Sequence, residues 1–207
     1  GTTGFPGRNH VREQLENKLA QMKADGMPLD VITFSGNGEP TLHPEFEYII
    51  ADTIAVRDHY FPQAKVSVLC NSTRLHLPQV VRALESVDNC ILKLDSAVTA
   101  TMRLIDQPNS PSFTCEYLIP QLEAFGNKCI IQTMMLRGNH AGKHIDNTTA
   151  EEVDALIQAY RRIGPRQVML YSIDRATPEA DLQKVEKEEL ETIAAKMREN
   201  GINVTVS

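Results

Sequence analysis

The chain has 207 residues, of which 42% are hydrophobic and 23% charged, a composition typical of one globular domain with a sizeable core. Its formal net charge of −6 argues against a broad nucleic-acid-binding surface. No apolar run is long enough to cross a bilayer and no signal peptide opens the sequence. We therefore expect a cytoplasmic protein that has no membrane partner.

Apolar strand-like runs alternate with amphipathic helical segments in the first half of the chain. In chain order, the pattern predicts a helix over 11–22, a strand over 30–34, a helix over about 44–60, a strand over 65–70 and a helix from Pro78. Gly26 can end the first of these helices, and Pro78 suits the first turn of the last.

The same alternation continues in the second half. It predicts a strand over 90–95, a helix over about 112–125, strands over 129–136 and 167–173, and a charged helix before a last strand over 202–206. Thr148 and Glu151 form a capping-box pattern that predicts a further helix, ended by Gly164-Pro165. The region 97–112 is left without a clear assignment, because Pro108 and Pro111 break any long helix.

Strand–helix units in this order predict a parallel sheet with right-handed crossovers. No linker, low-complexity tract or internal repeat interrupts the chain. We therefore expect a single domain over residues 1–207.

A glycine-rich segment, residues 34–42 (Phe-Ser-Gly-Asn-Gly-Glu-Pro-Thr-Leu), follows the first predicted strand. Its two glycines allow close approach of the backbone to a ligand, and Glu39 places a carboxylate at the mouth of the loop. A carboxylate suits an ammonium group, which carries three donors, and it repels phosphate. No Lys-Ser or Lys-Thr pair follows, as a phosphate-binding loop would require. The alternative is a turn that binds no ligand.

Ligands of parallel α/β folds bind where the strands end. The other predicted strand ends carry polar groups, at Asn71-Ser72, residues 93–96, residues 133–137 and residues 171–175. Taken singly, each is more often a strand-end cap than a ligand contact. Lys93 can point into the barrel or out toward a helix, since one step of register reverses its direction. Arg175 could anchor an anion, or form a surface salt bridge.

On the glycine-rich loop, with support from Lys93-Leu94-Asp95 and residues 171–175, the chain resembles the radical S-adenosylmethionine (radical SAM) superfamily. The loop is similar to that of the branch containing wyosine-type tRNA-modifying enzymes. The resemblance implies an α/β fold, a parallel partial (β/α) barrel of the radical SAM type that lacks its first strand.

The resemblance also implies S-adenosylmethionine as cofactor. The residues it assigns to cofactor binding are Gly36, Asn37, Gly38, Glu39, Asn71, Ser72, Asp95, Thr133 and Tyr171. In this assignment Glu39 and the glycine backbone hold the methionine amino group. Asn71, Ser72 and Asp95 serve the ribose or the carboxylate, and Thr133 and Tyr171 lie near the nucleoside.

The cysteines depart from the superfamily pattern. Radical SAM proteins carry a Cys-x3-Cys-x2-Cys motif for a 4Fe-4S cluster, whereas the four cysteines here are isolated residues, at positions 70, 90, 115 and 129. We expect reduced, buried thiols without disulfides. Metal-ligand spacing for His140 and His144 would require a helix, whereas Gly138 and Gly142 favour a loop, so we expect no metal ligands in this chain. Our hypothesis is an N-terminally truncated core, inactive without the cluster.

The intact enzyme would generate a 5′-deoxyadenosyl radical that abstracts hydrogen from an unknown small-molecule or macromolecular substrate. Its electron donor would be of the flavodoxin or ferredoxin type, and no catalytic residue is identified. Two alternatives remain: a non-catalytic α/β module that binds a nucleotide or an amino-acid-like ligand, and a scaffolding domain. A sheet edge left exposed by the absent strand predicts a possible homodimer.

Overall fold

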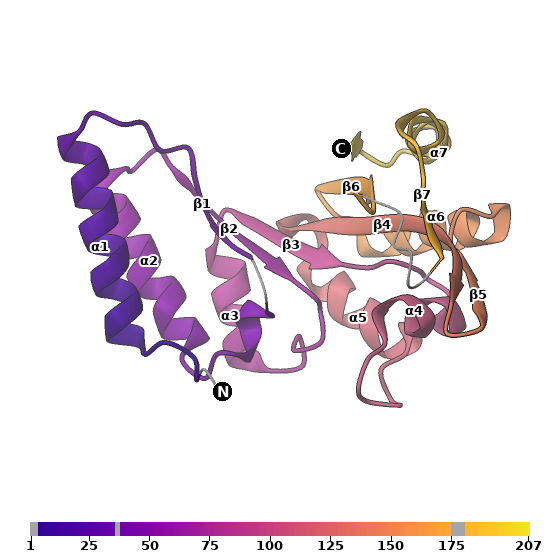
Figure 1. Cartoon of the computed structure of the whole chain (residues 1–207), viewed down its shortest axis with the longest axis horizontal. Helices are drawn as coiled ribbons and strands as arrows, with labels where there is room; N and C mark the ends of the chain where they lie inside the picture. The colour runs from indigo at the N-terminus through magenta and orange to yellow at the C-terminus, as the bar shows by residue number, and fades with distance from the viewer. Residues whose placement is uncertain (1–3, 36–37, 175–180) are drawn as a thin grey trace. The chain divides into compact units, whose positions relative to one another are not determined.

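The computed structural model describes residues 4–35, 38–174 and 181–207, and the chain divides into two compact units, Gly1–Ile91 and Leu92–Ser207. Each unit is an α/β structure (Figure 1). Among the helices of the described residues, none combines the length and the apolar character that a membrane span requires.

In the first unit, helix α1 (Arg8–Ala24) precedes strand β1 (Val31–Phe34), and α2 (Phe46–Tyr60) precedes β2 (Lys65–Cys70). The short 3-10 helix η1 (Pro40–Leu42) follows the glycine-rich loop, and α3 (Pro78–Ser86) closes the unit before β3 (Asn89–Lys93) leads the chain onward. Strands β1 and β2 pair in parallel, from Val31 opposite Lys65 to Phe34 opposite Val68. Helices α1 and α2 pack side by side (Figure 1).

The two strands of this unit differ in burial. In β2, Val66 and Val68 are fully buried, whereas every residue of β1 is half-buried or exposed, and Val31 is 44% exposed. Helix α1 likewise buries only Leu19 completely. Within the described residues of this unit, β1 pairs with a neighbour on one side only, so one of its edges remains open.

The second unit is built around a long strand, β4 (Cys129–His140). Helices α4 (Thr99–Asp106) and α5 (Cys115–Phe125) precede it. The elements after it are β5 (Lys143–Asp146), α6 (Ala150–Ile163), β6 (Gln167–Ser172), β7 (Leu182–Lys184), α7 (Lys187–Glu199) and β8 (Val204–Val206). The short 3-10 helix η2 (Gly126–Lys128) joins α5 to β4.

Strand β4 takes part in two different pairings. Its first half pairs in parallel with β6, from Ile130 opposite Gln167 to Met135 opposite Ser172, and β6 pairs in parallel with β8. Its second half pairs antiparallel with β5 and β7. The β4–β5 hairpin turns at Ala141 and Gly142, whose φ angles of 52° and 75° suit a two-residue turn.

Most predicted elements are confirmed, and three expectations need correction. The strand predicted over 129–136 continues to His140, and β5 and β7 were not predicted. The residues 97–112 contain α4, which ends before Pro108. The N-cap of α6 is Thr149, whose hydroxyl accepts a hydrogen bond from the Glu152 N–H, so the predicted capping box is wrong by one residue.

Candidate functional site

The glycine-rich loop lies at the carboxyl end of β1, as predicted. Glu39 is half-buried there, and its Oε2 accepts a hydrogen bond from the Asn71 main-chain N–H at 2.7 Å. This contact joins the loop after β1 to the loop after β2. The predicted residues Glu39 and Asn71 therefore come together, and the neighbouring Gly38 is exposed. Gly36 and Asn37 lie outside the described residues.

The loop after β2 is held by local contacts of its own. The Asn71 side-chain oxygen accepts hydrogen bonds from the Thr73 N–H at 3.0 Å and the Thr73 hydroxyl at 2.6 Å. Ser72 is fully buried and adopts a left-handed conformation with φ of 69°, which is uncommon for a residue other than glycine, asparagine or aspartate. The buried side chain of Ser72 stabilises the loop, while the exposed Asn71 remains accessible from solvent.

Cys70 ends β2 directly behind this loop. Burial, and then the negative charge of Glu39, raise the pKa of the Cys70 thiol to about 12. Its Sγ accepts a hydrogen bond from the Ser72 N–H at 3.3 Å. At neutral pH Cys70 is thus an uncharged structural thiol, since the thiolate is the form that reacts and binds metals.

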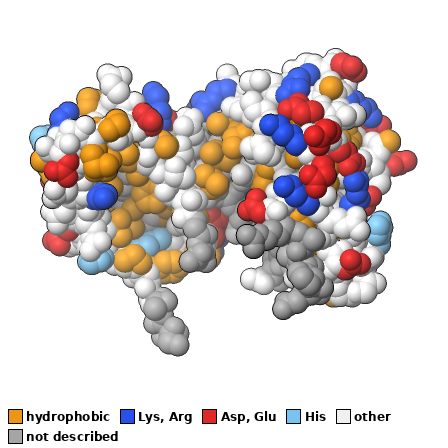
Figure 2. All heavy atoms as spheres, turned by 45° about the horizontal axis from the view of Figure 1, so that its top comes forward, with side chains coloured by type: hydrophobic (Ala, Val, Ile, Leu, Met, Phe, Trp, Pro, Cys, Tyr) orange, Lys and Arg blue, Asp and Glu red, His pale blue; other side chains and the backbone are white. Residues whose placement is uncertain are grey.

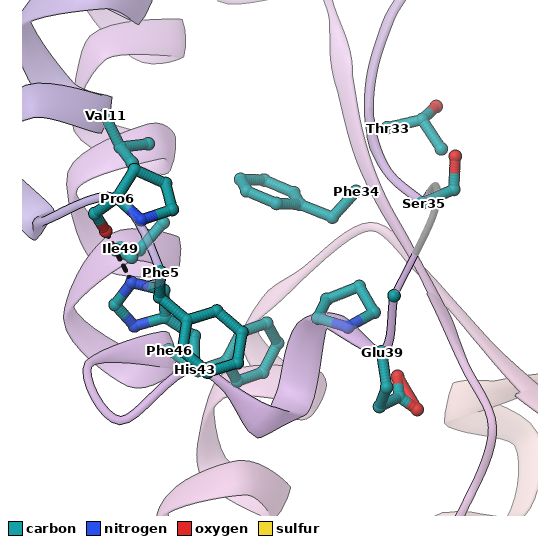
Figure 3. A pocket seen from close by; sticks show the side chains of 12 residues that line it. Phe5, Pro6, Val11, Thr33, Phe34, Ser35, Glu39, His43, Phe46 and Ile49 are labelled. Carbon is teal, nitrogen blue, oxygen red and sulfur yellow. Dashed lines mark hydrogen bonds between the residues drawn. The ribbon is translucent and has the colours of Figure 1, made fainter. Parts of the chain in front are cut away.

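An apolar pocket of about 370 Å³ lies beside the loop in the first unit. In Figure 3, Phe34 points toward Val11 and Pro6, while the Glu39 carboxylate at the edge of the view turns away from them. His43 donates a hydrogen bond from Nε2 to the Pro6 carbonyl at 2.7 Å, since its Nδ1 accepts one from the Glu45 N–H. Glu39 itself lines the pocket, so its carboxylate lies at the edge of a largely apolar cavity.

In the second unit, the predicted residue Asp95 follows β3 and is fully buried. Its Oδ1 accepts a hydrogen bond from the Met134 N–H at 2.9 Å, and its Oδ2 lies 3.1 Å from the Lys93 ammonium. The Asn147 amide donates to the Asp95 carbonyl at 2.8 Å and to the Met134 carbonyl at 2.7 Å. Asp95 is thereby fixed between the end of β3 and the middle of β4.

The sequence left open where the Lys93 side chain points. In the structure it points toward Asp95 and Asp106: its ammonium lies 3.1 Å from Asp95 Oδ2 and 3.9 Å from Asp106 Oδ1. Although burial opposes its charge, the neighbouring carboxyl groups raise the pKa of Lys93. The half-buried Tyr171 is close to the same charges: burial first and then the Asp95 carboxylate raise the pKa of its hydroxyl. Asp95 and Tyr171 therefore belong to one cluster, together with Lys93 and Asp106.

Asp106 was missed by the sequence analysis. It is the last residue of α4, in the stretch that had no assignment, and nothing local marks it as a site residue. Burial raises the pKa of Asp106 to about 9, with further contributions from its hydrogen bond to Asp95 and from the Asp95 charge. The carboxyl group of Asp106 is therefore protonated at neutral pH.

Thr133, also predicted, is fully buried away from solvent. Its hydroxyl donates to the Leu94 carbonyl at 2.7 Å and lies 2.5 Å from the Tyr160 hydroxyl, which is itself completely buried. These contacts give Thr133 a structural role within β4, and its assignment near a nucleoside stays a prediction. Arg175 lies outside the described residues.

The histidines and cysteines form no metal centre in the described residues. His140 and His144 lie on the β4–β5 hairpin and are not opposite one another, since His140 faces Lys143. All four cysteines are buried and free, as predicted. Burial raises the pKa of Cys115 to about 11 and that of Cys129 to about 12. The four thiols are separately buried, and in the described residues they belong to no group that could hold a metal ion.

No family model matches the chain. It is 25% identical over 182 residues to a protein named GTPase Obg from Brachyspira hyodysenteriae, covering 86% of this chain and 25% of that protein. It is 23% identical over 150 residues to a UPF0026 protein from Helicobacter pylori, covering 72% of this chain and 45% of the relative. The chain thus spans less than half the length of these curated relatives.

Three solved structures resemble the chain at low identity. They are a domain of pyruvate-formate lyase-activating enzyme from Bacteroides vulgatus (16% identity, TM-score 0.60, 86% of this chain and 99% of that chain), a radical SAM methyltransferase from Sphaerobacter thermophilus (15%, 0.70, 100% and 59%), and Streptococcus suis SuiB bound to S-adenosylmethionine (13%, 0.64, 95% and 43%). The predicted fold is confirmed: the chain has the parallel partial (β/α) barrel fold of radical SAM enzymes.

Proposed function

We propose that this chain is the core of a radical SAM enzyme and binds S-adenosylmethionine where β1 and β2 end. The observation that carries the proposal is the contact of Glu39 with the Asn71 N–H at 2.7 Å, in a chain with the radical SAM fold. One carboxylate oxygen orients Glu39, and the charge of the group suits an ammonium such as that of methionine. The exposed Gly38 beside it leaves the backbone open to close approach.

The iron–sulfur cluster of such an enzyme would be held by residues outside these 207, because the four thiols of this chain are separately buried and form no metal-holding group in the described residues. When bound, the cluster supplies the electron that makes S-adenosylmethionine a source of radicals. The contribution of this chain is to bind the cofactor and to place a substrate. By itself the chain would be inactive in the radical reaction.

The same cysteine observation favours a second candidate function, a non-catalytic module that binds a nucleotide or an amino-acid-like ligand. Such a module would keep the Glu39 loop without any cluster. A complete reading frame that lacks a Cys-x3-Cys-x2-Cys motif would favour this candidate.

We further propose a cytoplasmic location, which suits four free thiols, and an electron donor such as flavodoxin or ferredoxin. The open edge of β1, where Val31 is 44% exposed, is the proposed surface for a homodimer. Light scattering after size-exclusion chromatography tests the dimer. A monomer at every concentration would contradict it.

The proposed activity is tested by expressing the complete reading frame under anaerobic conditions, reducing it with dithionite and measuring 5′-deoxyadenosine formed from S-adenosylmethionine. We expect product from the complete protein and none from the 207-residue chain. Iron and sulfide should not assemble stoichiometrically on the 207-residue chain. Absence of product from a complete, cluster-loaded protein would overturn the enzyme proposal.

A further inference from the structure

The apolar pocket of about 370 Å³ in the first unit has no part in the proposed function. Small-molecule sites usually have volumes of roughly 300–1,000 Å³ and combine apolar walls with a few polar groups. Phe34, at the end of β1, points toward Val11 of α1 and toward Pro6 before it (Figure 3). Phe46 and Ile49 of α2 also line the pocket, and both are buried. The pocket therefore offers apolar and aromatic surface from three elements.

Solvent reaches this pocket from one side. Thr33, Ser35 and Gly38 line the pocket and are all exposed. Phe5, which also lines it, is 56% exposed. A small molecule in solution can therefore enter the pocket and contact an aromatic ring at its mouth.

The walls of the pocket are held in place by contacts between α2 and the segment that begins α1. His43 donates a hydrogen bond from Nε2 to the Pro6 carbonyl at 2.7 Å, and its ring contacts the Phe5 ring with 5.1 Å between the centroids. Arg8, the first residue of α1, donates to both carboxylate oxygens of Asp52 of α2, at 2.7 and 2.9 Å. A bidentate pair of this kind fixes orientation as well as distance. The pocket is thus formed before a ligand arrives, which lowers the entropic cost of binding.

Glu39 gives the edge of the pocket a negative charge. The hydrogen bond from the Asn71 N–H orients this carboxylate but does not neutralise it, because a main-chain amide carries no net charge. None of the described residues that line the pocket is a lysine or an arginine. An apolar interior is therefore joined to a negative edge.

We propose that this pocket binds the apolar part of an organic cation, a primary amine attached to an aromatic or a branched aliphatic group, with the ammonium at Glu39. Because the carboxylate lies at the edge of the pocket, the ammonium stays near solvent and only the apolar part enters, which avoids the cost of burying a charge. This inference rests on the proposed function in placing an ammonium at Glu39. Since S-adenosylmethionine would use the same carboxylate, the amine would compete with the cofactor.

Other occupants suit the pocket less well. An anion would be repelled by Glu39, and a small hydrophilic cation would leave the apolar walls in contact with water. A neutral apolar compound fits the walls but makes no use of the carboxylate. If β1 paired with a second copy of the chain, a side chain of that copy could enter, and the pocket would then be filled without any ligand.

The test is nuclear magnetic resonance of the 207-residue chain with ¹³C-labelled isoleucine methyl groups, titrated with phenethylammonium. We expect a saturable shift of the Ile49 methyl signal and none of Ile145, which is buried in the second unit. Phenethyl alcohol, which lacks the charge, and methylammonium, which lacks the ring, should each bind at least about tenfold more weakly. Phenylacetate, which has the opposite charge, should not shift the Ile49 signal.

Two variants locate the bound probe. Thr33→Trp introduces an indole that fills the pocket from an exposed strand position, where an aromatic residue is well tolerated, and should weaken binding by more than about tenfold. Glu39→Gln should reduce the affinity for phenethylammonium to that for phenethyl alcohol, because the charge of the carboxylate is lost. The control is Thr205→Trp, at an exposed position of β8 in the second unit, which should bind the probe as the wild type does.

Equal affinities for phenethylammonium and phenethyl alcohol, or unchanged affinity in Thr33→Trp, would overturn the inference. An Ile49 signal that moves with protein concentration in the absence of probe would do the same, because it would place a second copy of the chain in the pocket.

S-adenosylhomocysteine, which has the amino group of the cofactor, should raise the apparent dissociation constant of phenethylammonium. Binding of both compounds together at undiminished affinity would also contradict the inference. If the chain bound S-adenosylhomocysteine but the amine did not shift Ile49, this inference alone would fail. If the amine bound and S-adenosylhomocysteine did not, the proposed function alone would fail.

Discussion

The Glu39 carboxylate accepts a hydrogen bond from the main-chain N–H of Asn71 at 2.7 Å and so joins two loops that are 32 residues apart in sequence. A charged acceptor on a main-chain donor is among the stronger hydrogen bonds. The contact fixes one oxygen of Glu39 and with it the direction of the side chain. The position of the Glu39 charge at the mouth of the loop therefore depends on the contact with Asn71.

Replacement of Glu39 by alanine should destabilise the chain, because the Asn71 N–H loses its acceptor. We expect the free energy of unfolding to fall by about 1–2 kcal/mol, measured by urea denaturation. Glu39→Gln keeps an acceptor oxygen and should lose less. If the alanine variant were as stable as the wild type, the contact would not stabilise the loops.

Asn147 should be far more sensitive than its polar character suggests. Its amide donates to the carbonyls of Asp95 and Met134, and its Oδ1 accepts from the Leu136 N–H at 2.9 Å. Asn147→Ala leaves these main-chain groups buried without partners, which should cost about 2–4 kcal/mol of unfolding free energy. The matched control is Asn200→Ala, which removes an exposed bond to the Lys196 carbonyl and should change stability by less than about 0.5 kcal/mol.

Gly138 should tolerate no side chain. A Cβ at this position would lie 2.2 Å from the Asp181 carbonyl oxygen, and its φ is 139°. Gly138→Ala should therefore separate β7 from β4, which hydrogen–deuterium exchange would report as faster exchange at residues 182–184. Gly142→Ala is the control, since a Cβ there meets nothing within 4 Å and only its φ of 75° is unfavourable. Equal exchange in the two variants would contradict the steric explanation.

Stability should fall as pH rises because of Asp106. In the unfolded chain its carboxyl ionises near pH 4, whereas in the folded chain its pKa is raised to about 9 by burial and by Asp95. Between these values the folded state binds more protons than the unfolded state, so stability decreases with pH and levels off above about 9.

The slope that Asp106 contributes is at most about 1.4 kcal/mol per pH unit. Asp106→Asn should flatten the dependence between pH 5 and pH 8 (roughly the window set by the two pKa values), measured by denaturant midpoints at each pH. The control variant is Asp154→Asn, which changes an exposed aspartate of α6 that pairs with Lys196. Its stability should depend on pH with the same slope as the wild type. Identical slopes for the wild type and Asp106→Asn would show that Asp106 is ionised when folded.

The surface of the second unit carries acidic and basic side chains close together (Figure 2). The ion pairs Lys196–Asp154 and Arg198–Glu191 lie in this unit, and both are about half-exposed. Exposed pairs contribute little to stability.

Elements with a strong apolar period could be predicted from the sequence, and short ones could not. The strand β2 matches its prediction at both ends, because its short buried run, which includes Val66 and Val68, lies between clear turn signals. Strands β5 and β7 are short and largely polar, and their pairing with β4 depends on tertiary contacts. Helix α5 contains Pro120 in its interior, which packing tolerates.

The residues of the candidate site also differ in how far their positions could be predicted from the sequence. The place of Glu39 in the loop after β1 and that of Asp95 just after β3 could be predicted, whereas their roles in binding stay predictions. Asp106 could not be predicted, since its role comes from its proximity to Asp95, 11 positions earlier in the chain. Helix α4, which ends at Asp106, was not predicted because of the prolines that follow it. The burial of Ser72 and Thr133 was equally hidden, because a strand-end hydroxyl has the same sequence signal whether it faces solvent or the core.

The central claim is tested most directly by calorimetric titration of the 207-residue chain with S-adenosylhomocysteine, which carries the amino group and the nucleoside of the cofactor and needs no cluster. The account predicts saturable binding with one site per chain, weakened about tenfold in Glu39→Gln because the ammonium loses its charged acceptor. Absence of binding by the wild-type chain, or equal affinity of wild type and Glu39→Gln, would contradict it.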